Sequence, residues 1–496
     1  MRKFLLIAGI LAALCFSCEL PLENLPGPNP KDYNVNDPDV VRSFWAQNIA
    51  TRNYYKVSAV KLATGRHCQV WVEFHSGVNE ETAKKVADEY DNNIYKKMID
   101  AFSFKDYYDD HDDYTYSDAM EFADVLTDED GKLCILLFDI KDGYKKGVND
   151  AYVAGYFWAN DFFDRNYSNQ CDMIYIDTYP GVPGSEESNI TLAHEMQHLM
   201  NFATAMLMRS DDGYPKQMDV WIDEGLSAAA EWVYANKHSG DKWRWYNLNG
   251  DGRSIQSSID KGNNFFVWDN HKDENQYAIL DDYATVYLFF QWLRLQAGKL
   301  DIYKDIIISP DPDLWAVVYA IDEYSSNDYS DWETLLRDWL AANYINASSG
   351  IYGYKNDPVL NNITPKTVPA GTKSLNLYPG EGVYSVVNNT FTTMPSSDAG
   401  SYIRYAGLNK NFPQVSSSNV YTGGRLLTYN INSDFDGGSE QGTTTGIANI
   451  AAASDGRFVT EPLSGPFRIG ARDVLSRNER GNADFVRHSR RTVVNE

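Results

Sequence analysis

The chain has 496 residues, of which 43% are hydrophobic and 14% aromatic, enough for a large core and two or three domains. This composition excludes a disordered protein. Lysine and arginine total 44 against 69 aspartate and glutamate, and the formal net charge of -25 argues against bulk electrostatic binding to nucleic acid or an anionic membrane and favours solubility.

The N-terminus has the parts of a bacterial export signal. Arg2 and Lys3 precede an apolar run at residues 4–16, which is too short to span a bilayer. Ser17-Cys18 resembles the lipobox of bacterial lipoproteins, in which the cysteine is lipidated and becomes the new N-terminus. We therefore expect a signal peptide at residues 1–17, lipidation at Cys18 and a lipid-anchored protein of the bacterial cell envelope. An ordinary signal peptide with an incidental cysteine, and hence a secreted protein, is the alternative.

The next part of the chain is predicted to be a spacer followed by an α+β region. Residues 18–45 are rich in Pro, Asn and Asp, which favours a flexible spacer between a lipid anchor and the folded body. The runs at 68–74 and 133–140 are strand-like, and residues 79–102 have helical spacing. Further strand-like runs follow at 152–161 and 171–177, which fits an α+β half-domain.

The middle and the end of the chain differ in composition and in hydrophobic pattern. Residues 190–295 are mainly helical in pattern, and DDYATVYLFFQWLRLQ has a broad apolar face that predicts a buried helix. Beyond Pro358, short β-leaning runs alternate with Thr, Ser, Gly and Asn, which indicates a β-sandwich-like module. We therefore predict a main domain at residues 46–357 and a β-rich C-terminal module at 358–496.

Three cysteines remain after processing of the signal: Cys68, Cys134 and Cys171. Two of them lie in apolar, strand-like runs, and an odd number cannot form a complete disulfide framework. They are either buried free thiols or include one bridge. Their spacing contains no C-x-x-C metal-binding motif.

The strongest chemical signal is TLAHEMQHLMNF at residues 191–202. On a helix, residues four apart share a face, so His194 and His198 can bind one zinc ion. Glu195 adjoins the first histidine, where it can take a proton from zinc-bound water and hand it to a leaving amine. An apolar stripe on the other side of the helix leaves the histidine face to the metal. A chance match, with two histidines hydrogen-bonded in a core, is the alternative.

A second helical run weakens that alternative. VWIDEGLSAAAEWVYAN begins 22 residues after His198, and in it Glu224 can supply a third ligand and leave one position open for water. That arrangement is typical of a catalytic site. Glu231 lies on the same stripe as Glu224, so it can accept a hydrogen bond from a ligand imidazole, although a solvated helix charge explains it equally well.

These residues support a family resemblance. H-E-x-x-H followed by W-I-D-E-G resembles the gluzincin clan of zinc metallopeptidases, and the run GYFWAND, CDMIYIDTYPG, TLAHEMQHLMNF, WIDEGLSAAAEW is most similar to the hyicolysin-type family. The resemblance implies a gluzincin-like α+β domain with a mixed-sheet half and a helical half. It also implies one catalytic zinc held by His194, His198 and Glu224, with Glu195 as general acid/base. It covers roughly residues 130 to 300.

The chain departs from the clan in two places. Thermolysin-like enzymes have Asp four residues after the third ligand, whereas this chain has Ala228. The zinc aminopeptidases of the clan carry G-x-M-E-N before H-E-x-x-H to bind a free amine. The nearest string here, AMEF at 119–122, is too far upstream and lacks the Gly and the Asn. The first departure means that the role of that Asp must pass to another residue, and the second favours an endopeptidase over an aminopeptidase.

Several further residues are candidates for parts of such a site. Tyr283 resembles the downstream tyrosine that stabilises the oxyanion in several gluzincins, and His271 and Tyr287 are alternatives, although Tyr283 can equally be a core residue. Residues 155–158 lie where gluzincins place the edge strand that pairs with substrate, or they form an aromatic core run. The acidic clusters at 109–113 and 128–131 can hold Ca²⁺, but neither has EF-hand spacing and solvated turns explain them better.

The sequence thus predicts a lipid-anchored, extracytoplasmic zinc endopeptidase. Its substrates would be proteins or peptides, it would contact the membrane only through the N-terminal lipid, and it would bind no nucleic acid. The rival functions are a zinc aminopeptidase and a non-catalytic surface lipoprotein that binds a partner through residues 358–496.

Overall fold

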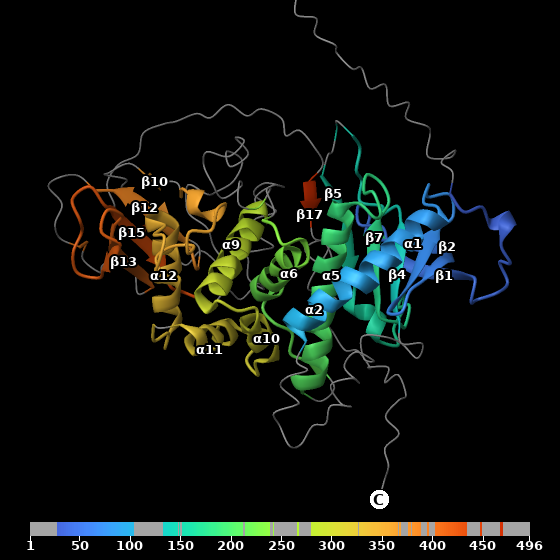
Figure 1. The fold of residues 1–496 in the computed structure, drawn as a ribbon, viewed down its shortest axis with the longest axis horizontal. Coiled ribbons are helices and arrows are strands. Elements are labelled where there is room, and N and C mark those ends of the chain that lie inside the picture. Colours follow the sequence, from blue (N-terminus) through green and yellow to red (C-terminus); the bar gives the residue numbers. More distant parts are fainter. Residues whose placement is uncertain are drawn as a thin grey trace, which may run out of the picture.

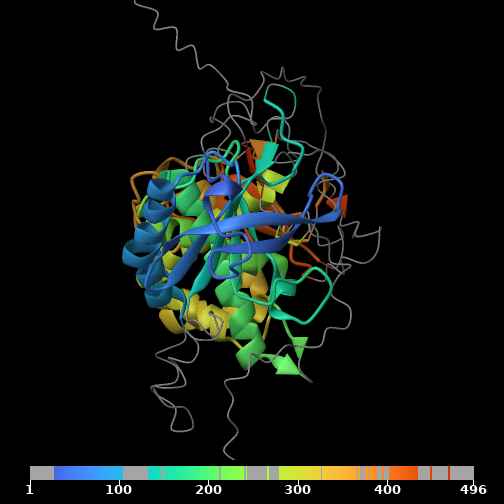
Figure 2. The ribbon, with the colours of Figure 1, turned by 90° about the vertical axis from the view of Figure 1, so that its right-hand side faces the viewer.

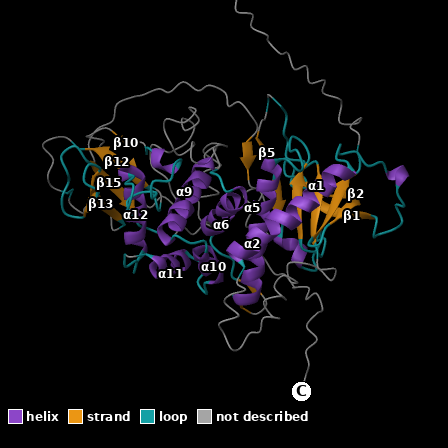
Figure 3. Ribbon diagram, viewed as in Figure 1, coloured by secondary structure: helices purple, strands orange, loops and turns teal. Residues whose placement is uncertain are grey.

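A computed structural model places most of the chain. It describes residues 27–103, 132–146, 148, 151–211, 214–238, 242, 265–266, 279–325, 327–365, 367–368, 375–377, 379–387, 394–395, 402–433, 447–448 and 467–469. The predicted signal peptide, Cys18, His271 and both acidic clusters lie outside these ranges. Strands gather at the two ends of the molecule and helices fill its middle (Figure 1, Figure 3).

The N-terminal half contains a six-stranded mixed sheet in the order β1-β2-β3-β4-β7-β6. The three central strands run parallel, and the remaining neighbours are antiparallel. The central strand LCILLF is apolar at every position and is buried on both faces, as parallel strands usually are. The strands are β1 (Val41–Gln47), β2 (Tyr54–Thr64), β3 (Cys68–Glu73), β4 (Leu133–Phe138), β6 (Gly155–Phe157) and β7 (Met173–Asp177).

Alternate residues of these strands serve two separate cores. Val70, Ile135 and Ile174 face the helices, whereas Leu136 and Met173 belong to a smaller core on the opposite face. Helices α1 (Glu80–Glu89), α2 (Tyr95–Phe102) and α5 (Glu186–Met208) lie on the first face. Seen from the β1 side, α1 and α2 run along one side of the sheet (Figure 2). A π-helical turn at Tyr90–Ile94 joins α1 to α2, so the predicted helix at 79–102 is confirmed with one irregular turn.

The predicted spacer at residues 18–45 extends too far. Strand β1 already begins at Val41, and a short 3₁₀ helix occupies Pro30–Asp32. The Pro28 carbonyl accepts a hydrogen bond from the amide of His75, which fixes residue 28 to the turn after β3. Tyr33 also packs against Phe74. The Pro- and Asp-rich composition of this segment therefore reflects turns that lie on the folded body.

The helical middle is built on α5, α6 (Val220–Ala235) and α9 (Ile279–Ala297). Helix α5 begins at Ser185, whose hydroxyl accepts a hydrogen bond from the amide of Ser188, and Glu186 and Glu187 in its first turn suit the helix dipole. It starts four residues before the predicted helical region. Helix α9 has a broad apolar face and is buried, as predicted, with Tyr287 and Phe290 fully enclosed.

Two glycines let these elements approach closely. A Cβ at Gly155 of β6 would lie 2.8 Å from the Thr191 methyl group of α5. A Cβ at Gly225 of α6 would lie 2.3 Å from the Phe290 ring of α9. Because neither separation is tolerated between carbon atoms, only glycine allows β6 and α9 to lie where they do. Helix α5 is therefore closely packed by β6 on one side and by α6 on another.

The C-terminal region contains a five-stranded sheet in the order β10-β12-β15-β13-β14, which is antiparallel except for its first pair. Helix α12 (Trp332–Ile345) lies against it: Tyr384 donates a hydrogen bond to the Leu340 carbonyl at 2.7 Å, and Arg404 pairs with Glu333 at 3.0 Å. The predicted α+β class with a β-rich C-terminus is confirmed. The domain limits at 46, 357 and 358 stay predictions, and in the described residues this sheet shares one core with α12.

The remaining elements are short or peripheral. The other helices are α10 (Asp301–Ile308) and α11 (Leu314–Tyr324), with 3₁₀ turns at Ala159–Phe162 and Leu360–Asn362. The other strands are β5 (Ala151–Val153), β8 (Ser210–Asp211), β9 (Tyr214–Pro215), β10 (Thr367–Val368), β11 (Leu375–Asn376), β12 (Gly382–Val386), β13 (Ile403–Asn409), β14 (Gln414–Ser416), β15 (Arg425–Asn430), β16 (Ile447–Ala448) and β17 (Phe467–Ile469). Among the helices of the described ranges, none combines the length and apolarity that a bilayer span requires.

The contact between Gly225 and Phe290 can be tested by adding one methyl group. Overpacking costs about 1–3 kcal/mol, and Ala is a better helix former than Gly by about 1 kcal/mol. We therefore expect Gly225→Ala to lower the free energy of unfolding by up to about 2 kcal/mol. Urea unfolding of this variant, of Phe290→Leu and of the double variant measures the coupling. Additive effects would show that the two residues do not constrain each other.

Candidate metal centre

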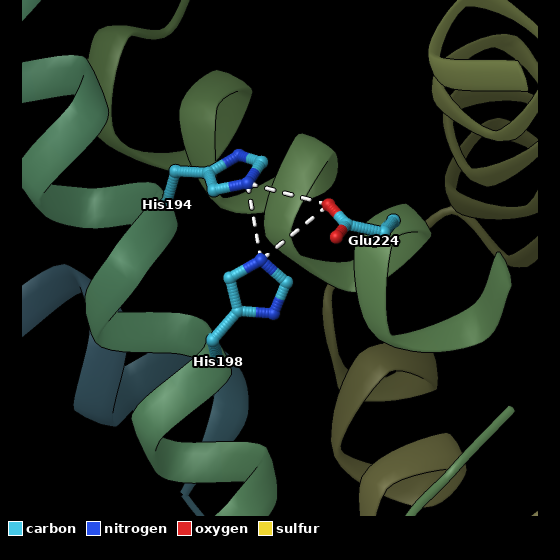
Figure 4. A group of neighbouring side chains, drawn as sticks. All are labelled: His194, His198 and Glu224. Atoms are coloured by element: carbon cyan, nitrogen blue, oxygen red, sulfur yellow. Dashed lines mark hydrogen bonds and ion pairs between the residues drawn. The ribbon is translucent and has the colours of Figure 1, made fainter. Parts of the chain in front are cut away.

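The two histidines of H-E-x-x-H and the downstream glutamate meet at one point. His194 and His198 project from α5 toward Glu224 on α6 (Figure 4). The Nε2 atoms of the two imidazoles are 3.2 Å apart. Glu224 Oε2 lies 3.5 Å from His194 Nε2 and 3.4 Å from His198 Nε2. Three ligand atoms from two helices thus form a nearly equilateral triangle.

This triangle has the dimensions of a tetrahedral zinc site. Zn–N and Zn–O bonds of about 2.0–2.1 Å place tetrahedral ligand atoms about 3.3–3.4 Å apart. The observed edges match that spacing. Both Glu224 carboxylate oxygens are buried without a hydrogen bond in the described part of the chain, as a carboxylate that awaits a cation would be. His194, His198 and Glu224 therefore fit a metal ion, and two imidazoles with one carboxylate are a donor set of catalytic zinc.

The charge state of Glu224 suits a ligand. Burial alone raises the pKa of a carboxyl group, but the adjacent His198 and His194 imidazoles hold the pKa of Glu224 well below its ordinary value. The group is therefore ionised at neutral pH and offers oxygen lone pairs toward the two histidines.

Glu231 lies beside the first histidine. Its Oε1 lies 2.9 Å from His194 Nδ1 and 2.5 Å from Lys242 Nζ. Burial raises the pKa of Glu231, but Lys242 and His194 together lower that pKa to about 2, so the group is a carboxylate. A carboxylate can only accept hydrogen bonds, so His194 carries its proton on Nδ1 in this contact, which leaves its Nε2 lone pair directed at the metal position. Glu231 is thus buried and in contact with His194, one helical turn beyond Ala228, and its role in orienting this histidine stays a prediction.

Asp223 lies beside the second histidine. Its Oδ2 lies 3.1 Å from His198 Nδ1, and its Oδ1 accepts a hydrogen bond of 2.5 Å from Asn201. Arg209 contacts Asn201 at 3.5 Å and donates to the carbonyls of Ile307 and Ser309. A buried polar chain therefore connects His198 to the end of α10.

Sequence reasoning missed Asp223 and Lys242. Asp223 stands directly before the third ligand within the W-I-D-E-G motif, so its position was visible although its role was not. No motif or spacing in the sequence pointed to Lys242, because its contact with Glu231 depends on the three-dimensional path of the chain. The Asp missing at position 228 was the clue that another carboxylate had to orient His194.

Glu195 is held by the edge of the sheet. Its Oε2 accepts a hydrogen bond of 3.0 Å from the amide of Phe157, the last residue of β6. Burial raises the pKa of Glu195 above its ordinary value, although the two histidines oppose this, so the carboxylate is a stronger base than an exposed one. Among the described strands, β6 is the last of its sheet and pairs only with β7. Its other edge, which carries the Phe157 amide, therefore borders the metal position.

The run at 155–158 is both an edge strand and a core segment. Tyr156 packs in the smaller core and Phe157 in the larger one, while their backbone forms the sheet edge. The two predictions for this aromatic run, an edge strand and a core segment, are therefore compatible, because its side chains pack in the cores while its backbone forms the edge of the sheet.

The two candidate tyrosines lie on the Lys242 side of the centre. The Lys242 ammonium is 5.7 Å from the Tyr283 ring centroid and 5.9 Å from that of Tyr287. The Tyr287 hydroxyl is hydrogen-bonded to His238 Nδ1 at 2.8 Å, and His238 Nε2 lies 2.9 Å from Asp357. Tyr283 is buried, and its predicted role in stabilising an oxyanion stays a prediction.

Comparison with known proteins agrees with this geometry. The chain is 31% identical over 337 residues to the neutral metalloprotease ShpI of Staphylococcus hyicus, and the match covers 66% of this chain and 68% of that protein. No family model matches the chain.

The contacts around His194 predict a measurable loss of metal affinity. Removing partners that orient a ligand histidine typically weakens metal binding about 10–100-fold. We expect Glu231→Gln to weaken zinc binding by about that factor, and Lys242→Met to weaken it less, because the Glu231 carboxylate remains. Competition with a chromophoric chelator measures the dissociation constants.

Lys237→Met is the matched control, because Lys237 pairs with Glu186 in an exposed contact beyond α6. Its zinc affinity should equal that of the parent protein. Unchanged affinity in Glu231→Gln would show that this carboxylate does not orient His194.

Proposed function

The chain belongs to the neutral metalloprotease family represented by ShpI, and from this premise we propose that it is a zinc-dependent endopeptidase of the gluzincin type, acting on proteins outside the cytoplasm. The observation that carries the proposal is the proximity of Glu195 to a buried His-His-Glu triangle. A closed structural zinc site has four protein ligands. Three ligands beside a buried carboxylate instead favour catalysis.

Glu195 would move the proton. Zinc, when bound here, supplies Lewis acidity that polarises a carbonyl group and lowers the pKa of water. The Phe157 amide holds Glu195 Oε2 and thereby fixes the carboxylate. Because burial raises the pKa of Glu195, the carboxylate can take a proton from the attacking water and then donate it to the amine that leaves.

Strand β6 would align the substrate. A peptide in extended conformation can add to a sheet edge through backbone hydrogen bonds. The edge of β6 opposite β7 borders the metal position, since its Phe157 amide reaches Glu195. A substrate strand on this edge would pass directly beside Glu195 and Glu224.

Tyr283 is our candidate for stabilising the oxyanion. The hydroxyl of the alternative, Tyr287, is engaged by His238 and hence by Asp357, which favours a structural role for it. The family resemblance supports Tyr283 at this position, and its nearness to Lys242 places it on the Glu231 side of the triangle.

We also propose a location at the cell envelope, anchored by lipid at Cys18. The support is the N-terminal sequence, with its basic start, apolar run and Ser17-Cys18. Because Pro28 is bound to the folded body, the ten residues after Cys18 would span at most about 35 Å when extended. The body would then lie close to the membrane surface.

Replacing Glu195 separates catalysis from metal binding. We expect Glu195→Gln to keep about one zinc per chain and to lose roughly 10²–10⁴-fold in kcat/KM on casein. Glu187→Gln, on the exposed first turn of the same helix, is the control and should keep full activity. Metal analysis and a fluorescent casein assay give the two readouts, and turnover retained by Glu195→Gln would contradict the mechanism.

Peptides with a blocked N-terminus separate the endopeptidase from an aminopeptidase. We expect cleavage of an internally quenched peptide whose amine is acetylated, at a rate similar to that of the free peptide, and loss of cleavage with a zinc chelator. Mass spectrometry of the products locates the cut. Release of single N-terminal residues from the free peptide alone would favour the aminopeptidase.

A further inference from the structure

Two of the three cysteines of the folded body lie together. Cys134 is in β4, and Cys171 precedes β7, the neighbouring parallel strand. The amide of Cys134 donates to the carbonyl of Asp172, the residue directly after Cys171, at 3.0 Å, and the Cys134 thiol is close enough to raise the pKa of the Cys171 thiol. Both side chains belong to the smaller core on the face of the sheet opposite α5. Cys134 pairs with Met173 in the strand register, so Cys171, two residues earlier, lies diagonally across from Cys134 on the same face of the sheet.

Cys68 is excluded from this pair by the geometry of the sheet. It lies in β3 and points to the other face, where its thiol donates to the Ala87 carbonyl at 3.9 Å. A disulfide needs Cα atoms within about 7 Å and Cβ atoms directed at each other, which residues on opposite faces of a sheet cannot satisfy. Cys68 is thus an internal control within the same fold.

We propose that Cys134 and Cys171 form a disulfide that joins β4 to the start of β7. The sheet already brings the two thiols onto the same face of adjacent strands, so closure requires only local adjustment. The bond would link residues 37 positions apart and would restrict the unfolded chain accordingly. Strand β7 pairs with β6, so the bond would brace the strand next to the one that holds Glu195. The disulfide itself does not depend on the proposed peptidase activity.

The bond would form while the chain folds. In the folded protein, the contact with Cys134 and burial raise the pKa of the Cys171 thiol, although Arg42, 3.7 Å from its Sγ, opposes the rise. A buried thiol of raised pKa reacts slowly, because the thiolate is the nucleophile. The oxidant would be a second disulfide, such as oxidised glutathione.

Two successive thiol–disulfide exchange steps would form the bond. One cysteine thiolate attacks the oxidant and releases one thiolate, and the second cysteine thiolate then displaces the other half. The protein loses two protons and two electrons, and the oxidant is reduced to two thiols. Both cysteines end as a single S–S bond between β4 and the segment before β7.

The test uses the full chain with Cys15→Ser and Cys18→Ser, which leaves three cysteines. The protein is refolded with oxidised glutathione or with a reductant, denatured, alkylated and digested, and its peptides are identified by mass spectrometry. After oxidation we expect a linked Cys134–Cys171 peptide, two hydrogen atoms lighter than the two thiol peptides, and an alkylated Cys68. The oxidised protein should also melt several degrees above the reduced one.

Single variants make the assignment specific. Cys68→Ser should still give the linked peptide, whereas Cys134→Ser should leave Cys171 alkylated or capped by glutathione. This readout does not depend on activity, so it stands whether or not the protein is a peptidase. Three alkylated cysteines after oxidative refolding, a bridge that includes Cys68, or glutathione on Cys134 and Cys171 without closure would each overturn the proposal.

Discussion

The candidate site depends on one contact, the insertion of the Glu224 carboxylate between two imidazoles. Glu224 is on α6, and its position is set by the residue beside it: Gly225 lets α6 approach the Phe290 ring of α9 at a distance that no other residue allows. Ser227 adds a buried hydrogen bond of 2.5 Å to Gln197 of α5. The metal triangle is therefore fixed by helix packing on both sides of α6.

Two helices supply almost the whole site. Helix α5 carries both histidines and Glu195, while α6 carries Glu224 and the two carboxylates that lie beside the histidines, Asp223 and Glu231. Asp223 and Glu224 are adjacent, and Glu231 lies two turns beyond Glu224 on the same stripe. Ala228, one turn after Glu224, is fully buried and has no carboxylate to offer. The carboxylate that contacts His194 is instead that of Glu231, one turn further along, whose longer side chain reaches back to the imidazole.

The sequence could predict those features that depend on neighbouring residues and on periodic spacing. The spacing in H-E-x-x-H placed His194 and His198 on one face of a helix, and the apolar pattern of residues 281–296 predicted a buried helix. It could not predict that Lys242 returns to Glu231, or that Phe157 donates to Glu195, because both contacts join segments far apart in the chain. The prediction of a flexible spacer up to residue 45 was wrong for a related reason. The turns in its described part are stabilised by contacts with distant residues, such as that of Pro28 with His75, and composition alone does not reveal such contacts.

Charge balance gives an argument for the metal that does not depend on the motif. Four buried carboxylates, those of Glu195, Asp223, Glu224 and Glu231, lie within this network. Among the residues that the structure describes, Lys242 and Arg209 are the cations seen in contact with it, and with neutral imidazoles these groups together carry a formal charge of -2. Uncompensated buried charge is costly, and a fold that keeps it gains most by binding an opposite charge. A divalent cation among His194, His198 and Glu224 would cancel that charge, so we expect metal binding by the residues of the site to stabilise the folded protein as well.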